Sequence, residues 1–164
     1  MIEITGDFAK KADKYEALVC TTNKVVMSND RLVMGAGIAK WFRDKYRDLD
    51  YIWGFQLQKN PQANVMCLEY KNDELDDGQW LIALPTKTDW KKSSSYSLIE
   101  TGLQELVVCV NALGIQSVLM TRPGCGNGGL DWETFECLNP IYHPSIKILC
   151  QKHLDNRFTI INKG

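Results

Sequence analysis

The sequence has little of what marks a membrane, secreted or metal-binding protein. No stretch reaches the ~18 apolar residues that a membrane-spanning helix needs. The N-terminal run Met1–Asp7 is acidic and alternating, unlike a secretory signal. The chain has 2 histidines, and its 6 cysteines form no Cys-x-x-Cys pair. We therefore expect no membrane segment, no metal site and a reducing, cytoplasmic setting.

An excess of charge of one sign is also lacking. Nineteen Lys and Arg residues oppose 20 Asp and Glu residues, so the formal net charge is -1. This excludes a strong general attraction to nucleic acid or anionic membranes, although a nucleic acid recognised through one attached group stays possible. The length of 164 residues predicts one domain over residues 1–164, and a content of 45% hydrophobic and 24% charged residues is ordinary for a soluble globular protein.

Apolar runs of strand length alternate with segments of helical spacing. We expect strands at residues 1–4, 17–22, 65–70, 79–84, 117–120, 146–150 and 158–161. Helices are expected after Met34–Ala39, over Asp48–Lys59, over a long segment that Gly114 ends, and from Trp132 to about Leu138. Three connections are expected: a solvated one at 8–16, an irregular one at 24–33 and a hairpin-like one at 72–78. The order predicts an α/β sandwich with a mixed sheet.

Two glycine-rich segments stand between a predicted strand and a predicted helix. One is Met34–Ala39, and the other is Pro123–Leu130, which holds four glycines within six residues. Such loops can turn backbone N–H groups towards an anion, and a helix N-terminus adds roughly half a positive charge. Either loop alone could instead be a turn that needs glycine only for its geometry.

Polar residues follow several of the predicted strands: Gly6 and Asp7, then Asn23, then Thr86 and Lys87. In open α/β sheets, ligands bind outside the carboxyl ends of the strands. Two anion-receptive loops in one crevice suit a diphosphate, and an aspartate after the first strand could accept a hydrogen bond from an adenine amine. The combination indicates an ADP-containing ligand.

These segments resemble the motifs of macro domains over Met1 to about Cys150, which implies a domain core over about residues 1–150. Ile4–Phe8 and Leu18–Asn23 are similar to the family's first two motifs, and the two glycine segments to its phosphate loops. The resemblance implies a three-layer α/β/α fold that binds ADP-ribose, with Asp7 at the adenine and Asn23 at the distal ribose. The expected ligand-binding residues are Gly6, Asp7, Phe8, Asn23, Met34, Gly35, Ala36, Gly37, Ile38, Ala39, Thr86, Pro123, Gly124, Cys125, Gly126, Asn127, Gly128, Gly129 and Leu130.

Within that family, the segment Leu84–Trp90 resembles the branch of bacterial antitoxins that remove ADP-ribose from DNA and of the human terminal ADP-ribose glycohydrolase. In that branch the lysine that matches Lys87 is catalytic. One departure is the ten-residue connection before Met34, which is longer than in the antitoxin type and could reshape the entrance beside the distal ribose.

A lysine at this position could attack the anomeric carbon of the opened distal ribose, provided that its amine is unprotonated. An unperturbed lysine, with a pKa of about 10.4, is protonated at neutral pH. Burial would lower the pKa of Lys87, whereas the phosphates of the ligand would raise it. The alternative is that Lys87 is a surface charge that only pairs with a phosphate.

Other candidates have simpler explanations. The human relative has an aspartate where this chain has Gly128, so that acid is absent, and Asp131 is expected to support a helix start. Cys125 lacks a histidine base, so we expect it to be a small loop residue. Trp132 is expected to pack beneath the loop, and Trp90 and Tyr96 either stack on a substrate or belong to the surface.

The sequence thus predicts a lysine-dependent hydrolase that removes ADP-ribose from a modified macromolecule, with DNA as one candidate. Two alternatives are hydrolysis of ADP-ribose-1″-phosphate and a reader that binds ADP-ribose without chemistry. The expected partner is ADP-ribose or an ADP-ribosylated macromolecule. We expect no cofactor and a monomer.

Overall fold

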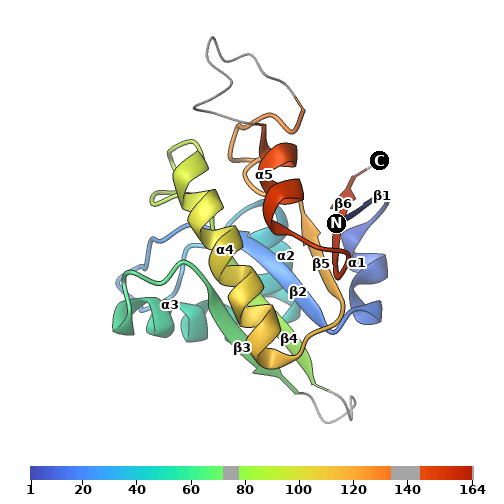
Figure 1. Cartoon of the computed structure of the whole chain (residues 1–164). Coiled ribbons are helices and arrows are strands. Elements are labelled where there is room, and N and C mark those ends of the chain that lie inside the picture. Colours follow the sequence, from blue (N-terminus) through green and yellow to red (C-terminus); the bar gives the residue numbers. More distant parts are fainter. Residues whose placement is uncertain (72–77, 134–144, 164) are drawn as a thin grey trace.

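Six strands form one sheet in the computed structural model, which describes residues 1–71, 78–133 and 145–163 (Figure 1). The order across the sheet is β1-β6-β5-β2-β4-β3. All neighbours are parallel except β3 and β4, which are antiparallel. The strands are β1 (Ile2–Thr5), β2 (Ala17–Thr22), β3 (Met66–Tyr70), β4 (Gln79–Pro85), β5 (Val118–Thr121) and β6 (Phe158–Asn162). The mixed sheet confirms the expected fold class.

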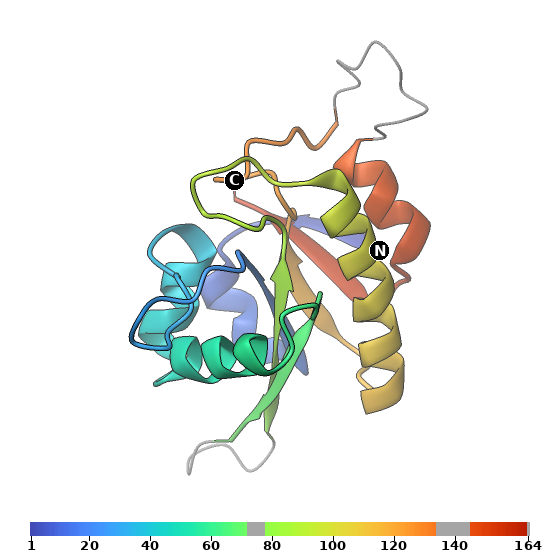
Figure 2. The ribbon, with the colours of Figure 1, turned by 90° about the vertical axis from the view of Figure 1, so that its left-hand side faces the viewer.

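Helices cover both faces of this sheet, so the molecule has three layers. One face carries α4 (Tyr96–Leu113) and α5 (Ile146–His153), and the other carries α2 (Gly37–Lys45) and α3 (Leu49–Lys59). Figure 2 shows the sheet nearly edge-on between these two pairs. Ser95 begins α4 by accepting a hydrogen bond from the Leu98 N–H, and Gly114 ends it with φ 66°, the left-handed conformation that glycine adopts most easily.

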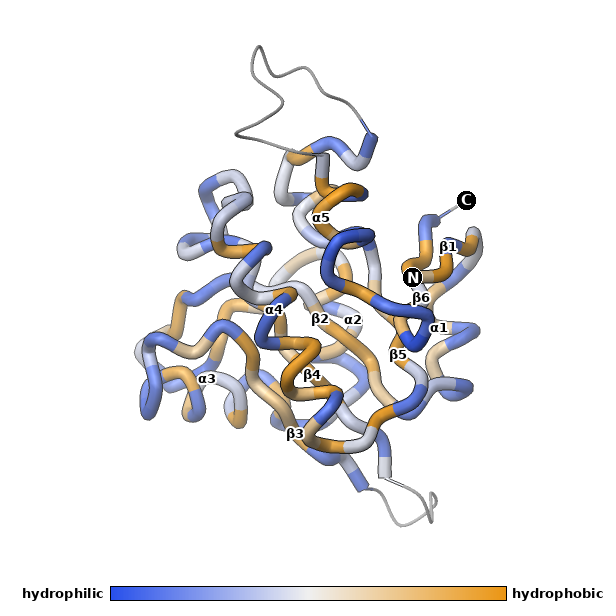
Figure 3. Tube along the Cα trace, in the orientation of Figure 1, coloured by the Kyte–Doolittle hydropathy of each residue, from blue (hydrophilic) through white to orange (hydrophobic). Residues whose placement is uncertain are grey.

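The central strands are apolar throughout because both of their faces are buried. Along β2, Ala17 and Val19 face α4 and α5, whereas Leu18 and Cys20 face α2 and α3. All four side chains have no exposed surface. Figure 3 shows this concentration of hydrophobic residues in the middle strands. Because successive side chains of a strand point to opposite faces, one short run supplies both halves of the core.

Most strand predictions agree with the structure to within one residue at each end, but the strand predicted at 146–150 is wrong. These residues form α5, whose first turn is capped by Ser145, since its hydroxyl accepts from the Ile148 N–H. Ile146, Leu149 and Cys150 are buried at helical spacing against the α4 side of the core. Most of the apolar residues that predicted a strand form the buried face of this helix, and Lys147 faces outward and pairs with Glu3 and Glu133.

The solvated connection predicted at 8–16 is also wrong in part. Residues 8–14 form α1 (Phe8–Lys11) and the 3₁₀ turn η1 (Ala12–Lys14). Phe8 and Ala12 are buried in the core on the α2 and α3 side, while the three lysines stay on the outer face. The basic composition of residues 8–14 therefore did not indicate the short amphipathic helix that these residues form.

The remaining expectations concern the chain ends and the segments outside the described residues. The core expected over about residues 1–150 also includes β6, in which Phe158 and Ile160 are buried. The connection predicted at 72–78 and the helix predicted at 132–138 lie mostly outside the described residues. Within the described ranges, no helix is both long and apolar enough to cross a membrane.

Candidate functional site

Five of the six strands run in the same direction, so their carboxyl ends meet at one edge of the sheet. This edge is directed to the top of Figures 1 and 2. Gly6 and Asp7 follow β1, Asn23 follows β2, Thr86 and Lys87 follow β4, and the second glycine loop follows β5. The structure thus brings together at one edge the polar segments that the sequence analysis selected.

Asp7 caps α1, because its Oδ1 accepts from the Ala9 N–H at 2.9 Å. The side chain is exposed, and a carboxylate has a second oxygen with which it can accept from a ligand amine. Phe8 behind it is buried and stacks edge-on against Trp41 at 5.3 Å. Of these two predicted ligand contacts, Asp7 is accessible to a ligand through its side chain, whereas the Phe8 ring supports the wall behind it.

Asn23 is buried and holds the connection that follows it. Its Nδ2 donates to the Val33 carbonyl at 2.9 Å, and its Oδ1 accepts from the Val25 N–H at 2.9 Å. The connection is a hairpin with a bridge between Val26 and Leu32, not the irregular segment that was expected. An amide has two donors and two acceptor lone pairs, so Asn23 can still meet a ligand hydroxyl. The preceding Thr22 Oγ1 is buried without a hydrogen-bond partner among the described residues.

The first glycine loop leads directly into α2. Ala36 is the residue before the helix and makes no side-chain cap, so the first N–H groups of α2 are available to an anion. Gly35, Ala36 and Gly37 are exposed, whereas the Met34 side chain is buried beneath them. Gly37 has φ 58°, and a Cβ there would lie 3.0 Å from Nδ2 of Asn127. The two glycine loops are therefore in contact at this point.

The second glycine loop is folded on itself. The Leu130 N–H donates to the Gly124 carbonyl at 2.9 Å, and the Gly129 N–H to the Gly126 carbonyl at 3.2 Å. In the described part of the chain, the N–H groups of residues 126–128 have no protein acceptor. These groups and the start of α2 together form a cradle of backbone donors, which is what a diphosphate requires.

Ser94 holds this loop, although it is not among the ligand-binding residues expected from the sequence. Its N–H donates to the Gly128 carbonyl at 2.9 Å, and its hydroxyl donates to Thr86 Oγ1 at 3.1 Å. It therefore joins the end of β4 to the second glycine loop. Ser95, its neighbour, is the cap of α4. No sequence pattern distinguishes the two serines, because the partner glycine lies 34 positions further along the chain.

Lys87 extends from the end of β4 towards the second glycine loop. Its Nζ donates to the Asn127 carbonyl at 3.3 Å, and its side chain is only partly exposed. The Thr86 N–H donates to the Thr22 carbonyl at 2.9 Å, which fixes the backbone next to the lysine. Lys87 thus lies beside the second glycine loop, and the residue before it is bonded to the residue before Asn23.

The end of the second loop is anchored away from the cradle. Trp132 is buried, donates from Nε1 to Glu3 at 3.0 Å and lies 4.8 Å beneath the Arg122 guanidinium. The anchoring role predicted for Trp132 is therefore observed. Asp131 Oδ1 accepts from the Glu133 N–H at 3.0 Å, which is a local turn contact.

Cys125 is a poor nucleophile in this loop. Burial, opposed by the nearby Arg122 charge and assisted by Asp131, raises the pKa of its thiol to about 12. The thiol is therefore protonated at neutral pH. This agrees with the interpretation of Cys125 as a small loop residue. Over the described ranges, no group of three or more His, Cys, Asp or Glu side chains could hold a metal ion.

The fold and these loops define an α/β/α domain whose free backbone N–H groups suit a diphosphate-containing ligand. No protein-family model matches the chain. It is 34% identical over 121 residues to the DNA ADP-ribosyl glycohydrolase of Mycobacterium tuberculosis, which covers 74% of this chain and 33% of the relative. The chain spans about a third of the length of the curated relatives it matches.

Two solved structures extend the likeness to the whole fold. The macrodomain of Mycobacterium tuberculosis DarG superposes with a TM-score of 0.73 at 28% identity, covering 99% of this chain and 97% of that one. Thermosipho africanus DarTG in complex with ADP-ribose superposes with a TM-score of 0.73 at 24% identity, covering 98% and 41%. The chain belongs to the macro domain family, in the branch that contains the DarG macrodomains. The family resemblance seen in the sequence is confirmed.

Proposed function

We propose that this domain binds ADP-ribose in the crevice and removes it from a modified base of DNA, with Lys87 as the nucleophile. The observation that carries the proposal is the contact of Lys87 Nζ with the Asn127 carbonyl at 3.3 Å, which joins the lysine to the anion cradle. The names of the relatives support it, since one is a DNA ADP-ribosyl glycohydrolase and another was solved in complex with ADP-ribose.

The arrangement of the crevice suggests how ADP-ribose would lie. Asp7 can accept from the adenine amine at the β1 end, and the diphosphate would lie between the start of α2 and the second glycine loop. The distal ribose would then reach Asn23 and Lys87. Thr22 Oγ1, which is buried and without a partner among the described residues, could gain one from a hydroxyl of that ribose.

In the proposed reaction, the neutral Lys87 amine attacks the anomeric carbon of the distal ribose. A C–N bond forms as the bond to the DNA base breaks, and the base leaves with the electron pair and takes up a proton. The ribose ring then opens: its C–O bond breaks, the remaining N–H proton passes to the ring oxygen, and the C=N bond of a Schiff base forms. Water hydrolyses this Schiff base, which releases ADP-ribose and restores the amine. The Asn127 carbonyl would orient Nζ towards the carbon by accepting one of its hydrogens.

The second glycine loop contributes no acid to this reaction. A Cβ at Gly128 would lie 2.2 Å from Ser94 Oγ and 2.4 Å from the Gly124 carbonyl oxygen, so no side chain fits there. The aspartate that the human relative has at this position would need a differently folded loop. We therefore propose that the loop holds the diphosphate and that Lys87 supplies the chemistry.

Replacing Lys87 with Ala tests this function. We expect release of ADP-ribose from modified DNA to fall by at least ~100-fold, because the nucleophile is lost, whereas ADP-ribose affinity measured by calorimetry changes only a few-fold. Lys59→Ala is the matched control, since Lys59 lies on α3 at the face of the sheet and its removal should leave both quantities unchanged. Reduction with borohydride during turnover should trap an adduct on Lys87 in wild type and none in the variant.

Four results would contradict the proposal. Undiminished hydrolysis by Lys87→Ala would exclude the lysine mechanism. Binding of ADP-ribose without release from modified DNA, modified protein or ADP-ribose-1″-phosphate would identify a reader, and release of phosphate alone would identify the phosphatase. Failure to bind ADP-ribose would exclude the whole assignment.

We also propose that the domain acts as a monomer in a reducing, cytoplasmic compartment. The reducing compartment is supported by the free thiols of all the described cysteines, which are Cys20, Cys67, Cys109, Cys125 and Cys150. Light scattering during size exclusion would show one species of 18.7 kDa if the monomer is correct.

A further inference from the structure

We propose that the loop over residues 87–95 docks the DNA strand that carries the ADP-ribose, with Trp90 stacking on an unpaired base and Lys91 and Lys92 contacting phosphates. The inference rests on the proposed function, and it adds a surface that recognises the acceptor beyond the crevice. It predicts a preference for single-stranded DNA, because only an unpaired base offers a free face for stacking.

The base of this loop is held rigidly beside the catalytic lysine. The Ser95 N–H donates to the Thr86 carbonyl at 2.9 Å, which closes the loop, and Ser94 ties it to Gly128. At the tip, Asp89 Oδ1 accepts from the Lys91 N–H at 2.9 Å and the Asp89 carbonyl accepts from the Lys92 N–H at 3.1 Å. The tip is therefore a defined turn that projects from the crevice immediately after Lys87.

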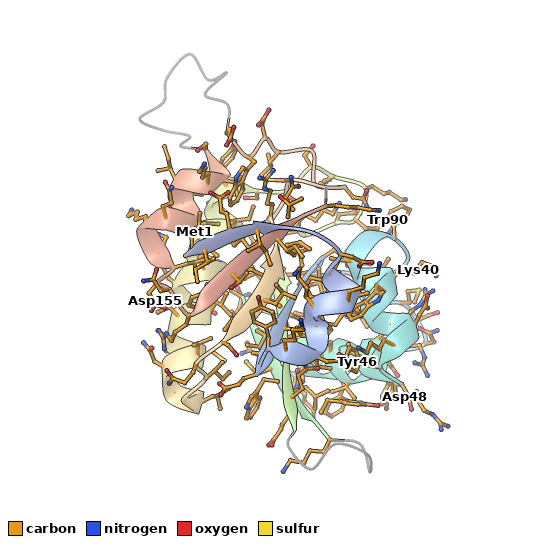
Figure 4. All side chains as sticks on the ribbon, turned by 90° about the vertical axis from the view of Figure 1, so that its right-hand side faces the viewer. Met1, Lys40, Tyr46, Asp48, Trp90 and Asp155 are labelled. Carbon is orange, nitrogen blue, oxygen red and sulfur yellow. The ribbon has the colours of Figure 1, made fainter. Side chains whose placement is uncertain are left out.

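Trp90 lies on this turn and is the most exposed aromatic side chain among the described residues. Half of its surface is accessible, and Figure 4 shows it at the outer edge of the molecule. By contrast, Trp53 and Trp132 are buried in the core. An indole left in water makes a large apolar surface available for stacking, and tryptophan is enriched where binding energy is concentrated.

Cations accompany the indole. The Lys91 ammonium lies 5.2 Å from the Trp90 ring centroid, and Lys92 is exposed beside it. The two lysines place two positive charges next to the indole, whereas the chain as a whole has a formal net charge of -1. The carboxylate of Asp89 is directed to the backbone of its own turn. The local charge therefore complements a phosphate backbone although the domain as a whole does not.

A polar hollow beside the loop extends this surface. Its volume is about 390 Å³, and it is lined by Asn64, Thr88, Ser95, Ser97, Leu98 and Thr101. Thr88 is the residue after Lys87, so the hollow begins where the acceptor would leave the crevice. Hydroxyl and amide groups of this kind bind sugar and phosphate oxygens. An aromatic ring, two lysines and a polar hollow on one side of the nucleophile suit a nucleic-acid strand better than an apolar peptide.

The chain offers a matched control on another surface. Phe55 on α3 is 49% exposed and has the Lys59 ammonium 5.3 Å from its ring centroid, which reproduces the pair of Trp90 and Lys91. Figure 2 shows α3 well below the strand ends, whereas the 87–95 loop lies above them. Phe55→Ala therefore removes an equivalent aromatic ring that should not meet the strand.

The experiment compares an ADP-ribosylated single-stranded oligonucleotide with an ADP-ribosylated mononucleotide. For Trp90→Ala we expect KM for the oligonucleotide to rise about 10-fold with kcat unchanged, since stacking contributes to binding in both the ground and the transition state. KM for the mononucleotide and the affinity for free ADP-ribose should not change, and Trp90→Phe should restore most of the loss. Phe55→Ala should resemble wild type, and all variants should melt at the wild-type temperature.

Replacing Lys91 and Lys92 with Ala should flatten the salt dependence of oligonucleotide binding by about 1.4 in log–log slope, because each single-strand phosphate contact contributes ~0.7. An unchanged slope of oligonucleotide affinity against salt concentration would show that Lys91 and Lys92 do not contact phosphates. An unchanged oligonucleotide KM for Trp90→Ala, an equal change with the mononucleotide, or equal use of a fully paired duplex would overturn the stacking role.

Binding of the modified oligonucleotide to Lys87→Ala, measured by fluorescence polarisation, separates this inference from the proposed function. Suppose that wild type shows no hydrolysis, and that adding Trp90→Ala to the Lys87→Ala variant still weakens oligonucleotide binding. The docking surface then stands and the hydrolase assignment fails. If hydrolysis is normal and Trp90 has no effect, the hydrolase stands and the docking surface is overturned.

Discussion

The two glycine loops have similar compositions but need glycine for different reasons. At Gly35 in the first loop, an added Cβ would meet no atom within 4 Å. In the second loop, a Cβ at Gly124 would lie 2.8 Å from Ile99, and one at Gly128 would lie 2.2 Å from Ser94 Oγ. The first loop is open at Gly35, where the proposed function places the ligand, whereas the second loop is filled by its own neighbours at Gly124 and Gly128.

The two loops therefore contribute in different ways to the proposed ligand site. The second loop is preformed, because Ser94 and its internal hydrogen bonds fix it before any ligand arrives. When a loop already has its bound conformation, less of the binding free energy is lost in ordering that loop. The first loop contributes the uncapped start of α2, which a bound anion would stabilise.

The largest effect is expected for Gly128→Ala. The added methyl group would overlap with Ser94 Oγ and with the Gly124 carbonyl oxygen, and the backbone cannot move without breaking the Ser94 to Gly128 hydrogen bond. We expect the free energy of unfolding to fall by about 3 kcal/mol and ADP-ribose binding to be lost. Thermal denaturation and calorimetry measure the two.

Gly126→Ala is the control within the same loop, since a Cβ there would meet no atom within 4 Å. Its stability should be near that of wild type. Equal destabilisation by the two substitutions would show that the loop is not filled in the way described.

An intermediate effect is expected for Gly37→Ala. Its φ of 58° disfavours a side chain, and the Cβ would lie 3.0 Å from Asn127 Nδ2, which belongs to a flexible side chain and can give way. We expect a loss of about 1 kcal/mol from backbone strain and a moderate loss of ADP-ribose affinity. Chemical denaturation reports the first and calorimetry the second.

Gly114→Ala isolates the strain, because Gly114 has φ 66° with no atom within 4 Å of its Cβ and lies at the end of α4. The two variants should lose a similar amount of unfolding free energy, and only Gly37→Ala should lower the affinity for ADP-ribose. A much greater loss at Gly37 would mean that the contact between the two glycine loops is rigid.

The smallest effect on stability is expected for Gly35→Ala. With neither a left-handed φ nor a neighbour, the free energy of unfolding should change by less than about 0.5 kcal/mol. We expect ADP-ribose affinity to fall about 10-fold nonetheless, because the methyl group would occupy space that the ligand needs. Unchanged affinity would place the diphosphate elsewhere and remove the distinction between the loops.

The strand ends show what could be predicted from the sequence. Buried parallel strands must be continuously apolar, so Ala17–Thr22 and Gln79–Pro85 were visible as runs, and the polar residues after them had to lie at one edge. The errors at 146–150 and 8–16 have the opposite cause. Both are short helices whose faces are set by contacts with distant elements, such as Lys147 with Glu3 and Phe8 with Trp41.

The family resemblance, the open α/β layering, the two glycine loops and the lysine after β4 could all be read from the chain's residues, because each depends on neighbouring residues or on a motif. The three-dimensional contacts were needed to show which serine holds the second loop, why Gly128 admits no side chain, and that Trp90 stays exposed. Those properties depend on atoms that the fold brings together from positions far apart in the chain. Packing and exposure follow from such contacts, and no local pattern contains them.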